Sequence, residues 1–158
     1  AALRALAQHA SRERDTVLTD FETLWSGESL VMDKWFGVQA SSRAPDALAR
    51  VRRLEQHPEF DLKKPNKVRA LLGMFAHGNP HAFHAADGSG YEFVADRIAG
   101  LDTLNPQVAA RLVTAFARWS RITGPRQAMM RDALVRIQLH AGLSRDVGEM
   151  VSRTLGDA

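Results

Sequence analysis

Residues 105–119 read Asn-Pro-Gln-Val-Ala-Ala-Arg-Leu-Val-Thr-Ala-Phe-Ala-Arg-Trp, and this stretch decides the fold class. Its Asn-Pro start places a capping side chain before a proline, which suits the first helical position because it lacks a backbone N–H. Apolar residues then recur three or four positions apart, which places them on one stripe of a helix: Val108, Leu112, Ala115, Phe116 and Trp119. We therefore predict an amphipathic helix over residues 105–121.

The same two signals recur along the whole chain. Stripes of apolar residues at helical spacing are bounded by proline, glycine and capping residues, and no stretch shows the sustained alternation of a half-buried strand. Short connections between such helices favour antiparallel neighbours. The pattern predicts ten helices, at residues 2–9, 12–26, 28–40, 45–56, 65–77, 80–85, 90–101, 105–121, 125–141 and 144–156.

The predicted fold class is all-α, in one helical domain over residues 1–158. Antiparallel helix pairs in series are typical of an irregular superhelical solenoid of the ARM or HEAT kind. The sequence shows no clean repeat, so any repeat is structural. A closed helical bundle is the alternative, because periodicity does not distinguish the two arrangements.

Composition excludes several classes of function. The chain has no cysteine, which excludes disulfides, thiolate metal ligands and a cysteine nucleophile, and fits the cytoplasm. Its 21 basic and 18 acidic residues leave a formal net charge of only +3, so we expect no nucleic-acid partner. No apolar run approaches the ~20 residues that span a bilayer, so we expect no membrane partner. The chain starts at Ala1 without Met, and we interpret it as a piece of a longer polypeptide; removal of the initiator Met is the alternative.

Five ordered segments together resemble the bacterial aminopeptidase N family. The resemblance covers nearly the whole chain and is strongest from residue 30 to residue 112. The segments are Leu-Val-Met-Asp-Lys-Trp-Phe at 30–36, Pro-Asn-Lys-Val-Arg at 65–69, Asn-Pro through Phe-His at 79–84, Asp-Gly-Ser-Gly-Tyr at 87–91 and Asn-Pro-Gln-Val-Ala at 105–109.

This resemblance implies that the chain is the C-terminal helical domain of a zinc-dependent aminopeptidase that removes N-terminal residues from peptides. The family's H-E-x-x-H and G-A-M-E-N motifs are absent from this sequence. The resemblance therefore places the zinc and the catalytic residues in an upstream domain of the same polypeptide. We expect no catalytic residue, no cofactor and no metal site in this fragment, and no activity from it alone. Its implied role is to cap the active site and restrict substrate entry.

The resemblance also implies a substrate-binding role for Arg69, Arg111 and Gln107, which match cavity-facing positions of the family's segments. The spacing and chemistry of these residues support part of this expectation. Gln107 and Arg111 are four residues apart and share a helix face. A guanidinium is always charged and binds a carboxylate through two parallel hydrogen bonds. We therefore expect contacts with the peptide beyond the cleaved bond. A solvated surface charge is the alternative for any single arginine.

Four other groups have structural interpretations. His81 and His84 could share a helix face, but no third ligand completes a metal site. The turn at residues 87–90 lacks the pattern of a phosphate or calcium loop, and Ser89 is available to cap the next helix. Arg50, Arg52 and Arg53 are expected on an exposed polar face. The aromatic residues are expected in the core: Trp25, Trp35, Phe36, Phe75, Phe116 and Trp119.

Two other functions compete with the peptidase hypothesis. A free-standing helical-repeat module that binds protein partners is the first, because solenoids commonly bind proteins and the chain has no catalytic centre. A helical nucleic-acid-binding domain is the weaker second, since the charge balance is near neutral and no binding motif is present.

Overall fold

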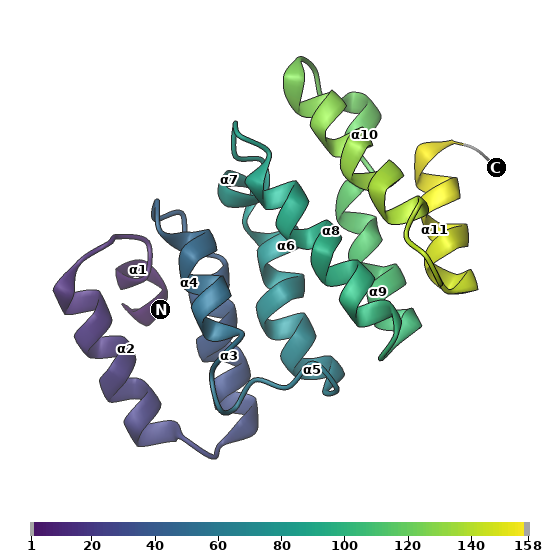
Figure 1. Ribbon diagram of the computed structural model, residues 1–158. Helices are drawn as coiled ribbons and strands as arrows, with labels where there is room; N and C mark the ends of the chain where they lie inside the picture. Colours follow the sequence, from purple (N-terminus) through teal and green to yellow (C-terminus); the bar gives the residue numbers. More distant parts are fainter. Residues whose placement is uncertain (1, 157–158) are drawn as a thin grey trace. The chain divides into compact units, whose positions relative to one another are not determined.

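The computed structural model describes residues 2–156, and every regular element in that range is helical (Figure 1). This confirms the all-α prediction. The chain forms two compact units, Ala1–Ala82 and Phe83–Ala158, each with its own apolar core. The expectation of a single domain over the whole chain stays a prediction.

Unit 1 is built from antiparallel helices that pack in sequence order. Helix α3 is its centre, because α2, α4 and the turn η1 all pack against it. The elements of unit 1 are α1 (Ala2–Leu6), α2 (Arg12–Trp25), α3 (Ser29–Ala40), α4 (Ala47–Leu54), α5 (Pro65–Val68), η1 (Arg69–Gly73), α6 (Met74–Gly78) and α7 (Pro80–Phe83), the last of which ends at the first residue of unit 2.

The core of unit 1 is centred on aromatic residues of α3. Phe36 is fully buried, and its ring meets the Trp35 and Phe60 rings edge-on at centroid distances of 5.3 and 6.0 Å. The buried Trp35 indole donates a hydrogen bond of 3.0 Å to the Leu18 carbonyl oxygen, which fixes α3 against α2. A buried indole N–H needs such a partner. This confirms a core role for Trp35 and Phe36.

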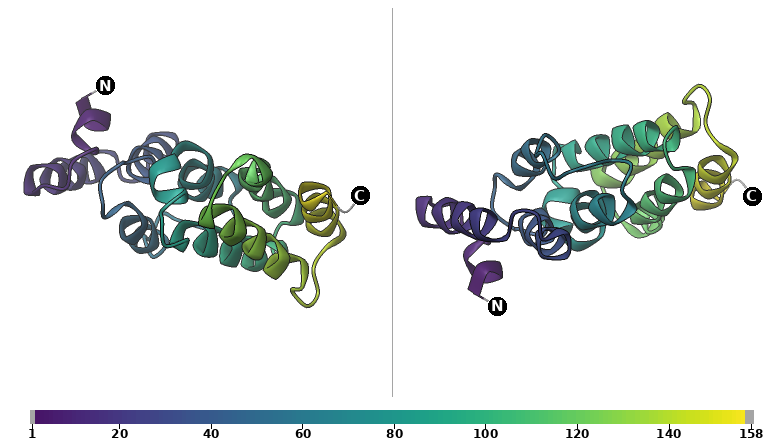
Figure 2. Two further views of the ribbon diagram at one scale, coloured as in Figure 1. Left: turned by 90° about the horizontal axis from the view of Figure 1, so that it is seen from above. Right: turned by 90° about the horizontal axis from the view of Figure 1, so that it is seen from below.

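Unit 2 packs α8 against both α9 and α10, and α11 against α9 (Figure 2). Its core contains a cluster of three rings, in which Phe83 meets Tyr91 at 5.2 Å and Phe116 at 5.3 Å between centroids. The elements of unit 2 are α8 (Ser89–Asp102), α9 (Pro106–Val113), η2 (Thr114–Phe116), η3 (Trp119–Arg121), α10 (Pro125–Gln138) and α11 (Arg145–Leu155).

The helix predicted over residues 105–121 is shorter than expected. The α-helix ends at Val113, and two 3₁₀ turns follow. Distant contacts hold the residues after Val113: Phe116 is fully buried against Phe83, and the Trp119 indole donates a 2.7 Å hydrogen bond to the Thr154 carbonyl oxygen. Such tertiary contacts override the local helical repeat. The prediction of one continuous helix was therefore wrong.

The segment predicted as one helix over residues 65–77 is helical throughout but not regular. Its middle turn, Arg69–Gly73, is a π-helix, with α-helix before and after it. Such a turn holds one residue more than an α-helical turn, and single π turns occur frequently at functional sites. Leu71 and Leu72 in the turn are both buried.

The cap predicted at Asn105 is confirmed, and Asn79 and Ser144 cap their helices in the same way. The side-chain oxygens of Asn79, Asn105 and Ser144 accept hydrogen bonds from the backbone N–H groups of Ala82, Val108 and Val147, at 3.0, 3.1 and 3.3 Å. Each bond satisfies an N–H group that has no partner inside its helix.

The cap predicted at Ser89 is wrong. Helix α8 begins at Ser89, and Gly88 precedes it in a left-handed conformation with φ of 75°. Asp87 Oδ1 accepts hydrogen bonds from the Ser89 N–H and hydroxyl at 3.0 and 2.7 Å, so the aspartate supplies the oxygen of this turn. Aspartate commonly bonds to the backbone two residues further on in this way.

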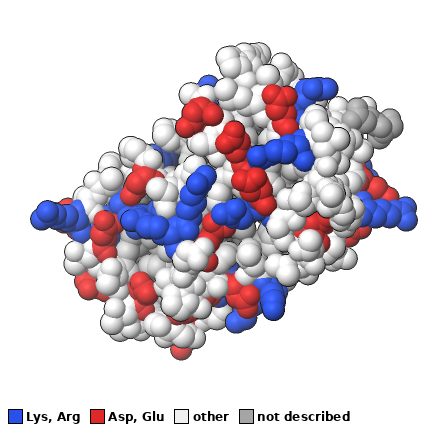
Figure 3. Space-filling view, in the orientation of Figure 1, with Lys and Arg blue, Asp and Glu red and all other residues white. Residues whose placement is uncertain are grey.

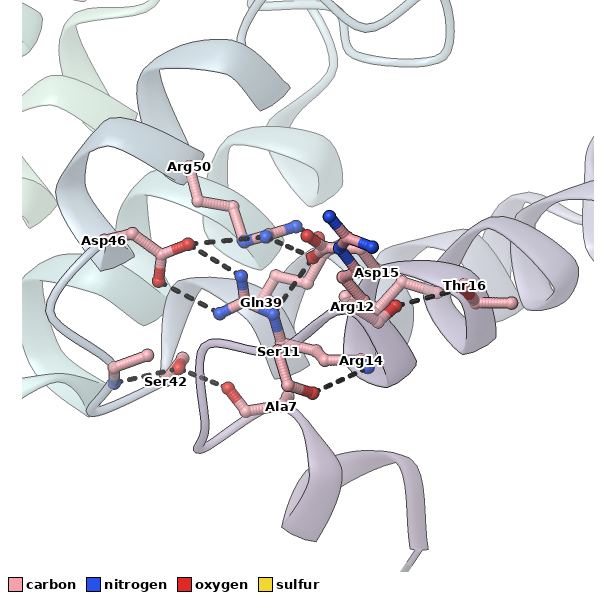
Figure 4. A network of polar contacts seen from close by, with 12 residues as sticks. Ala7, Ser11, Arg12, Arg14, Asp15, Thr16, Gln39, Ser42, Asp46 and Arg50 are labelled. Atoms are coloured by element: carbon pink, nitrogen blue, oxygen red, sulfur yellow. Dashed lines mark hydrogen bonds and ion pairs between the residues drawn. The ribbon is translucent and has the colours of Figure 1, made fainter.

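A polar network joins α2, α3 and α4 (Figure 4). The Arg14 side chain is only 3 % exposed, and it donates two hydrogen bonds of 3.0 and 2.7 Å to the Asp46 carboxylate. Arg50 donates to Asp15 at 2.6 Å and to Gln39 Oε1 at 3.2 Å. Burial opposes ionisation of Asp46, but the hydrogen bonds from Arg14 outweigh it and lower the pKa of that carboxyl.

This network corrects one prediction about the arginines of α4. Arg50 does not lie on an exposed polar face, because its side chain is 11 % exposed and ion-paired to Asp15 and Asp46. Arg52 and Arg53 are exposed, as expected. The periodicity of α4 alone did not reveal that Arg50 faces Asp15 of α2 and Asp46 at the start of its own helix.

Within residues 2–156, no helix is both long enough and apolar enough to cross a membrane. On the face drawn in Figure 3, basic and acidic side chains are intermingled.

Candidate functional site

Arg69 is the first residue of the π-helical turn η1 in unit 1, and its side chain is exposed. Its Nη1 donates a 3.3 Å hydrogen bond to Asn66 Oδ1, one turn earlier. The buried Val68 and Leu71 on either side hold the backbone of this turn in the core. The guanidinium is therefore carried on a fixed backbone while its remaining donors stay available.

Gln107 and Arg111 both lie on α9 in unit 2 and are both exposed. The opposite side of the helix is anchored by Ala109, Leu112 and Val113, which are at most 4 % exposed. The helix therefore presents Gln107 and Arg111 on one face, as the spacing of four residues predicts. The Asn105 cap fixes the start of this helix.

The Arg111 guanidinium has no hydrogen-bond or ion-pair partner within the described part of the chain. This contrasts with Arg14 and Arg50, whose guanidinium groups are held by carboxylates. An arginine with five free donors is able to bind an oxyanion from outside the chain. Arg69 belongs to one compact unit and the pair on α9 to the other.

The two histidines considered as metal ligands, His81 and His84, differ in exposure and in hydrogen bonding. His81 is exposed, whereas His84 is partly buried and its Nδ1 lies 2.8 Å from the Tyr91 hydroxyl. Burial is the main cause that lowers the pKa of His84, and the nearby Arg126 adds to it. Burial also raises the pKa of Tyr91. Within residues 2–156, no group of three or more His, Cys, Asp or Glu side chains is arranged to hold a metal ion.

Unit 1 carries a groove with a volume of 1570 Å³, formed by residues of α1, α3, η1 and α6. Leu30 and Met74 contribute apolar surface to it and are 73 and 38 % exposed. Arg4, Lys34 and Arg43 also line it, and their side chains have no carboxylate partner within the described residues. This groove was not visible in the sequence, because the residues that line it come from helices far apart in the chain.

The π-helical turn that begins at Arg69 was not visible in the sequence. A π turn requires hydrogen bonds between residues five apart, and no residue type specifies it. A β-carbon at Gly37 of the neighbouring α3 would lie 3.5 Å from the Ala70 carbonyl oxygen, which is ordinary van der Waals contact, so this glycine gives no signal of the turn.

Comparisons with known proteins agree on one relationship. The family model described as "Domain of unknown function (DUF3458_C) ARM repeats" matches residues 1–156. Its ARM repeats agree with the helical-solenoid class predicted from the sequence. The crystal structure of Legionella pneumophila aminopeptidase A in complex with aspartic acid is similar, with a TM-score of 0.93 and 40 % identity over 99 % of this chain and 18 % of that chain.

Curated relatives are bacterial aminopeptidases N. The Haemophilus influenzae protein is 42 % identical over 98 % of this chain and 18 % of its own length. The Caulobacter vibrioides protein is 46 % identical over 90 % of this chain and 17 % of its own length. The Escherichia coli protein is 43 % identical over 90 % of this chain and 16 % of its own length.

The chain thus spans less than a fifth of the length of each of these relatives. The same family is indicated by the helical architecture, by the family model, and by the similarity to solved and curated aminopeptidases. The chain belongs to the DUF3458_C ARM-repeat family and is homologous to the C-terminal region of bacterial aminopeptidase N.

Proposed function

We propose that this chain is the C-terminal helical part of a cytoplasmic, zinc-dependent aminopeptidase N that removes N-terminal residues from peptides. In this proposal the zinc and the catalytic residues belong to an upstream domain of the same polypeptide. The helical part covers the active site, so that only chain ends and short peptides reach it. It contributes no catalytic residue and is inactive alone.

Arg69, Arg111 and Gln107 are proposed to bind the substrate on the C-terminal side of the cleaved bond. The observation that supports this role most directly is the exposed and unpaired guanidinium of Arg111, which shares a face of α9 with Gln107. A guanidinium donates two parallel hydrogen bonds to a carboxylate, and a glutamine amide donates to a carbonyl oxygen. A short peptide offers both kinds of acceptor.

The proposed substrate-binding role of Arg69 is supported by a different observation. It begins a π-helical turn, the kind of irregularity that occurs frequently at functional sites. Its side chain is exposed and makes only a 3.3 Å hydrogen bond to Asn66. Its acceptor is a neutral amide oxygen, so this long hydrogen bond is weaker than one from the same guanidinium to a substrate carboxylate and can be replaced by it.

Replacement of Arg111 by alanine in the intact enzyme tests the proposal. Hydrogen bonds to charged groups contribute about 1.5–3 kcal/mol, so kcat/KM for a tripeptide should fall by roughly 10- to 150-fold. Turnover of a single-residue amide, which has no distant carboxylate, should change far less. Steady-state kinetics with both substrates measure the ratio.

The matched control is Arg131→Ala, which removes an exposed arginine of α10 in the same unit. We expect wild-type kinetics with both substrates. Equal losses of tripeptide and amide turnover in Arg111→Ala would contradict substrate binding by this residue. An intact enzyme without peptidase activity would contradict the proposed function as a whole.

The free-standing interaction module remains the second candidate, and the groove of unit 1 favours it. That groove combines exposed apolar residues with cations that have no partner in the described part of the chain. A module of this kind would bind an acidic peptide without any upstream catalytic domain. An H-E-x-x-H motif encoded upstream in the same reading frame would support the peptidase and exclude the free-standing module.

A further inference from the structure

The side chain of Lys67 is buried in unit 1, although it carries a charge. Lys67 lies in the last turn of α5, and its side chain is only 4 % exposed. Its Nζ lies 2.9 Å from Asp33 Oδ1, donates a 3.3 Å hydrogen bond to the Ser29 carbonyl oxygen, and stands 5.5 Å from the centroid of the Phe36 ring. All three partners belong to α3, so the ammonium group ties α5 to that helix.

Stability alone does not account for this buried pair of charges. Removing an ammonium group and a carboxylate from water costs free energy that their attraction barely repays, and an apolar pair of similar volume is often at least as stable. An ion pair is directional, however, because its two charged atoms must stay close together. The pair of Lys67 and Asp33 is therefore suited to fix the orientation of α5 about its own axis.

Helix α5 is too short to fix its own orientation. It has four residues, and its N-cap residue Lys64 makes no side-chain capping hydrogen bond. The π turn η1 follows it directly. Because a helix of this length is not stable by itself in water, its orientation is set by the groups that it buries. In α5 these are Lys67 and Val68, of which Lys67 makes the directional contacts.

The orientation of α5 determines the direction in which Arg69 points. Successive residues of an α-helix are about 100° apart around its axis, so Lys67 and Arg69 lie on nearly opposite sides. Accordingly, Lys67 is buried against α3 and Arg69 is exposed. The 3.3 Å hydrogen bond from Arg69 Nη1 goes to Asn66 Oδ1, on α5 itself. That bond moves with the helix, so it does not fix the guanidinium relative to the rest of unit 1.

From the burial of Lys67 and its position opposite Arg69, we infer that Lys67 and Asp33 are positioning residues for Arg69. Their ion pair holds α5 in one orientation and so fixes the direction in which the Arg69 guanidinium meets a substrate carboxylate. The inference rests on the proposed function for the role of Arg69 in substrate binding. A guanidinium must be aligned to donate two parallel hydrogen bonds, and a displacement of about 1 Å can reduce a rate by about 100-fold.

A double substitution in the intact enzyme, Lys67→Met with Asp33→Leu, tests the inference. It removes both charges together and leaves no unpaired buried charge, so we expect stability close to that of the wild type. The kcat/KM for a tripeptide should fall at least about fivefold, but no further than in Arg69→Ala, because a misdirected guanidinium loses part of its bond to the carboxylate. Turnover of a single-residue amide should stay within about twofold of wild type. An unchanged ratio of tripeptide to amide turnover would overturn the inference.

Two further variants separate positioning from a loss of stability. Arg14→Met is the matched control, because it breaks another buried ion pair of unit 1, on α2. It should lower stability but leave the ratio of tripeptide to amide turnover unchanged, and the same change of ratio as in the double variant would overturn the inference. Adding the double substitution to Arg69→Ala should cause no further loss of tripeptide turnover, since residues that act as a unit are not additive. Additive losses would also overturn it.

Amide hydrogen exchange, read by mass spectrometry, measures the order of this segment without any substrate. In the double variant, residues 65–73 should exchange at least about fivefold faster than in the wild type, with residues 47–54 of α4 as the internal reference. Equal exchange would overturn the inference, whatever the kinetics. Failure of the proposed function would appear differently, as unchanged tripeptide turnover in Arg69→Ala or as an inactive wild type. Either result would overturn the purpose assigned to the ion pair, even where exchange shows that the pair orders the segment.

Discussion

At the scale of single residues, the two classes of arginine in this chain differ in what surrounds them. Arg14 is buried and holds Asp46 with two hydrogen bonds, whereas Arg145 pairs with Glu149 on the surface, where the two side chains are 88 and 55 % exposed. Removing one partner of a buried pair leaves an uncompensated charge, but an exposed pair contributes little.

Arg14→Met should therefore lower the free energy of unfolding by about 2–4 kcal/mol, somewhat below a fully buried pair because Asp46 is 31 % exposed. Urea unfolding followed by circular dichroism measures the change. Arg145→Met is the matched control and should leave stability unchanged. A similar effect of the two substitutions would show that the network of Figure 4 does not stabilise unit 1.

At the scale of elements, two Asn-Pro pairs look alike in the sequence but differ in their contacts. Asn105 caps α9 with one hydrogen bond of 3.1 Å. Asn79 caps α7 and is also fully buried, where its Nδ2 donates to the Ala40 and Ser42 carbonyl oxygens at 2.8 and 2.6 Å. Asn79 therefore connects α7 to the end of α3.

Asn105→Ala should cost about 1 kcal/mol, the usual effect of losing a helix cap. Asn79→Ala should cost about 2–4 kcal/mol, because it also leaves two buried carbonyl oxygens without their donor. Chemical denaturation of both variants measures the difference. Equal losses would mean that solvent replaces the buried partners of Asn79.

At the scale of the whole molecule, ionisable groups predict how stability depends on pH. The pKa of His84 is lowered by burial and then by Arg126, so the folded state disfavours its protonation. The unfolded histidine takes up a proton near its ordinary pKa of about 6.5, and the folded one only at lower pH. Stability therefore falls as the pH drops through the interval between these two values.

Asp46 adds a second decrease at lower pH. Its pKa in the folded protein is lowered chiefly by the hydrogen bonds from Arg14. The stability that its ionised form contributes is fully present above the unfolded pKa of about 3.9 and is lost as the pH falls toward the folded value. Two separate decreases are expected on acidification: one from His84, and a more acidic one to which Asp46 contributes together with other carboxyls whose pKa is lowered, such as Asp15.

Thermal unfolding between pH 8 and pH 2.5 measures this profile. His84→Gln should remove the decrease that begins near pH 6.5 while retaining the acidic one, and Asp46→Asn should reduce the acidic one. A profile of the His84→Gln variant that follows the wild type over the whole range would contradict the role assigned to His84.

The sequence by itself determined the helical class, most helix boundaries and the side-chain caps of α7, α9 and α11. These features follow from local rules: apolar periodicity places a stripe on a helix, and Asn-Pro or serine marks its start. The family resemblance, the candidate residues Arg69, Gln107 and Arg111, and the common face of the last two on α9 were also visible in the sequence.

Only the tertiary structure decided features that depend on contacts between distant segments. It ended α9 at Val113 because Phe116 and Trp119 are held by distant partners. It placed a π turn at Arg69, paired the largely covered Arg50 with Asp15 of α2, and left Trp25 exposed on α2. The physical reason is the same each time: periodicity specifies which face of a helix is apolar, but the neighbouring helices specify which part of that face is covered.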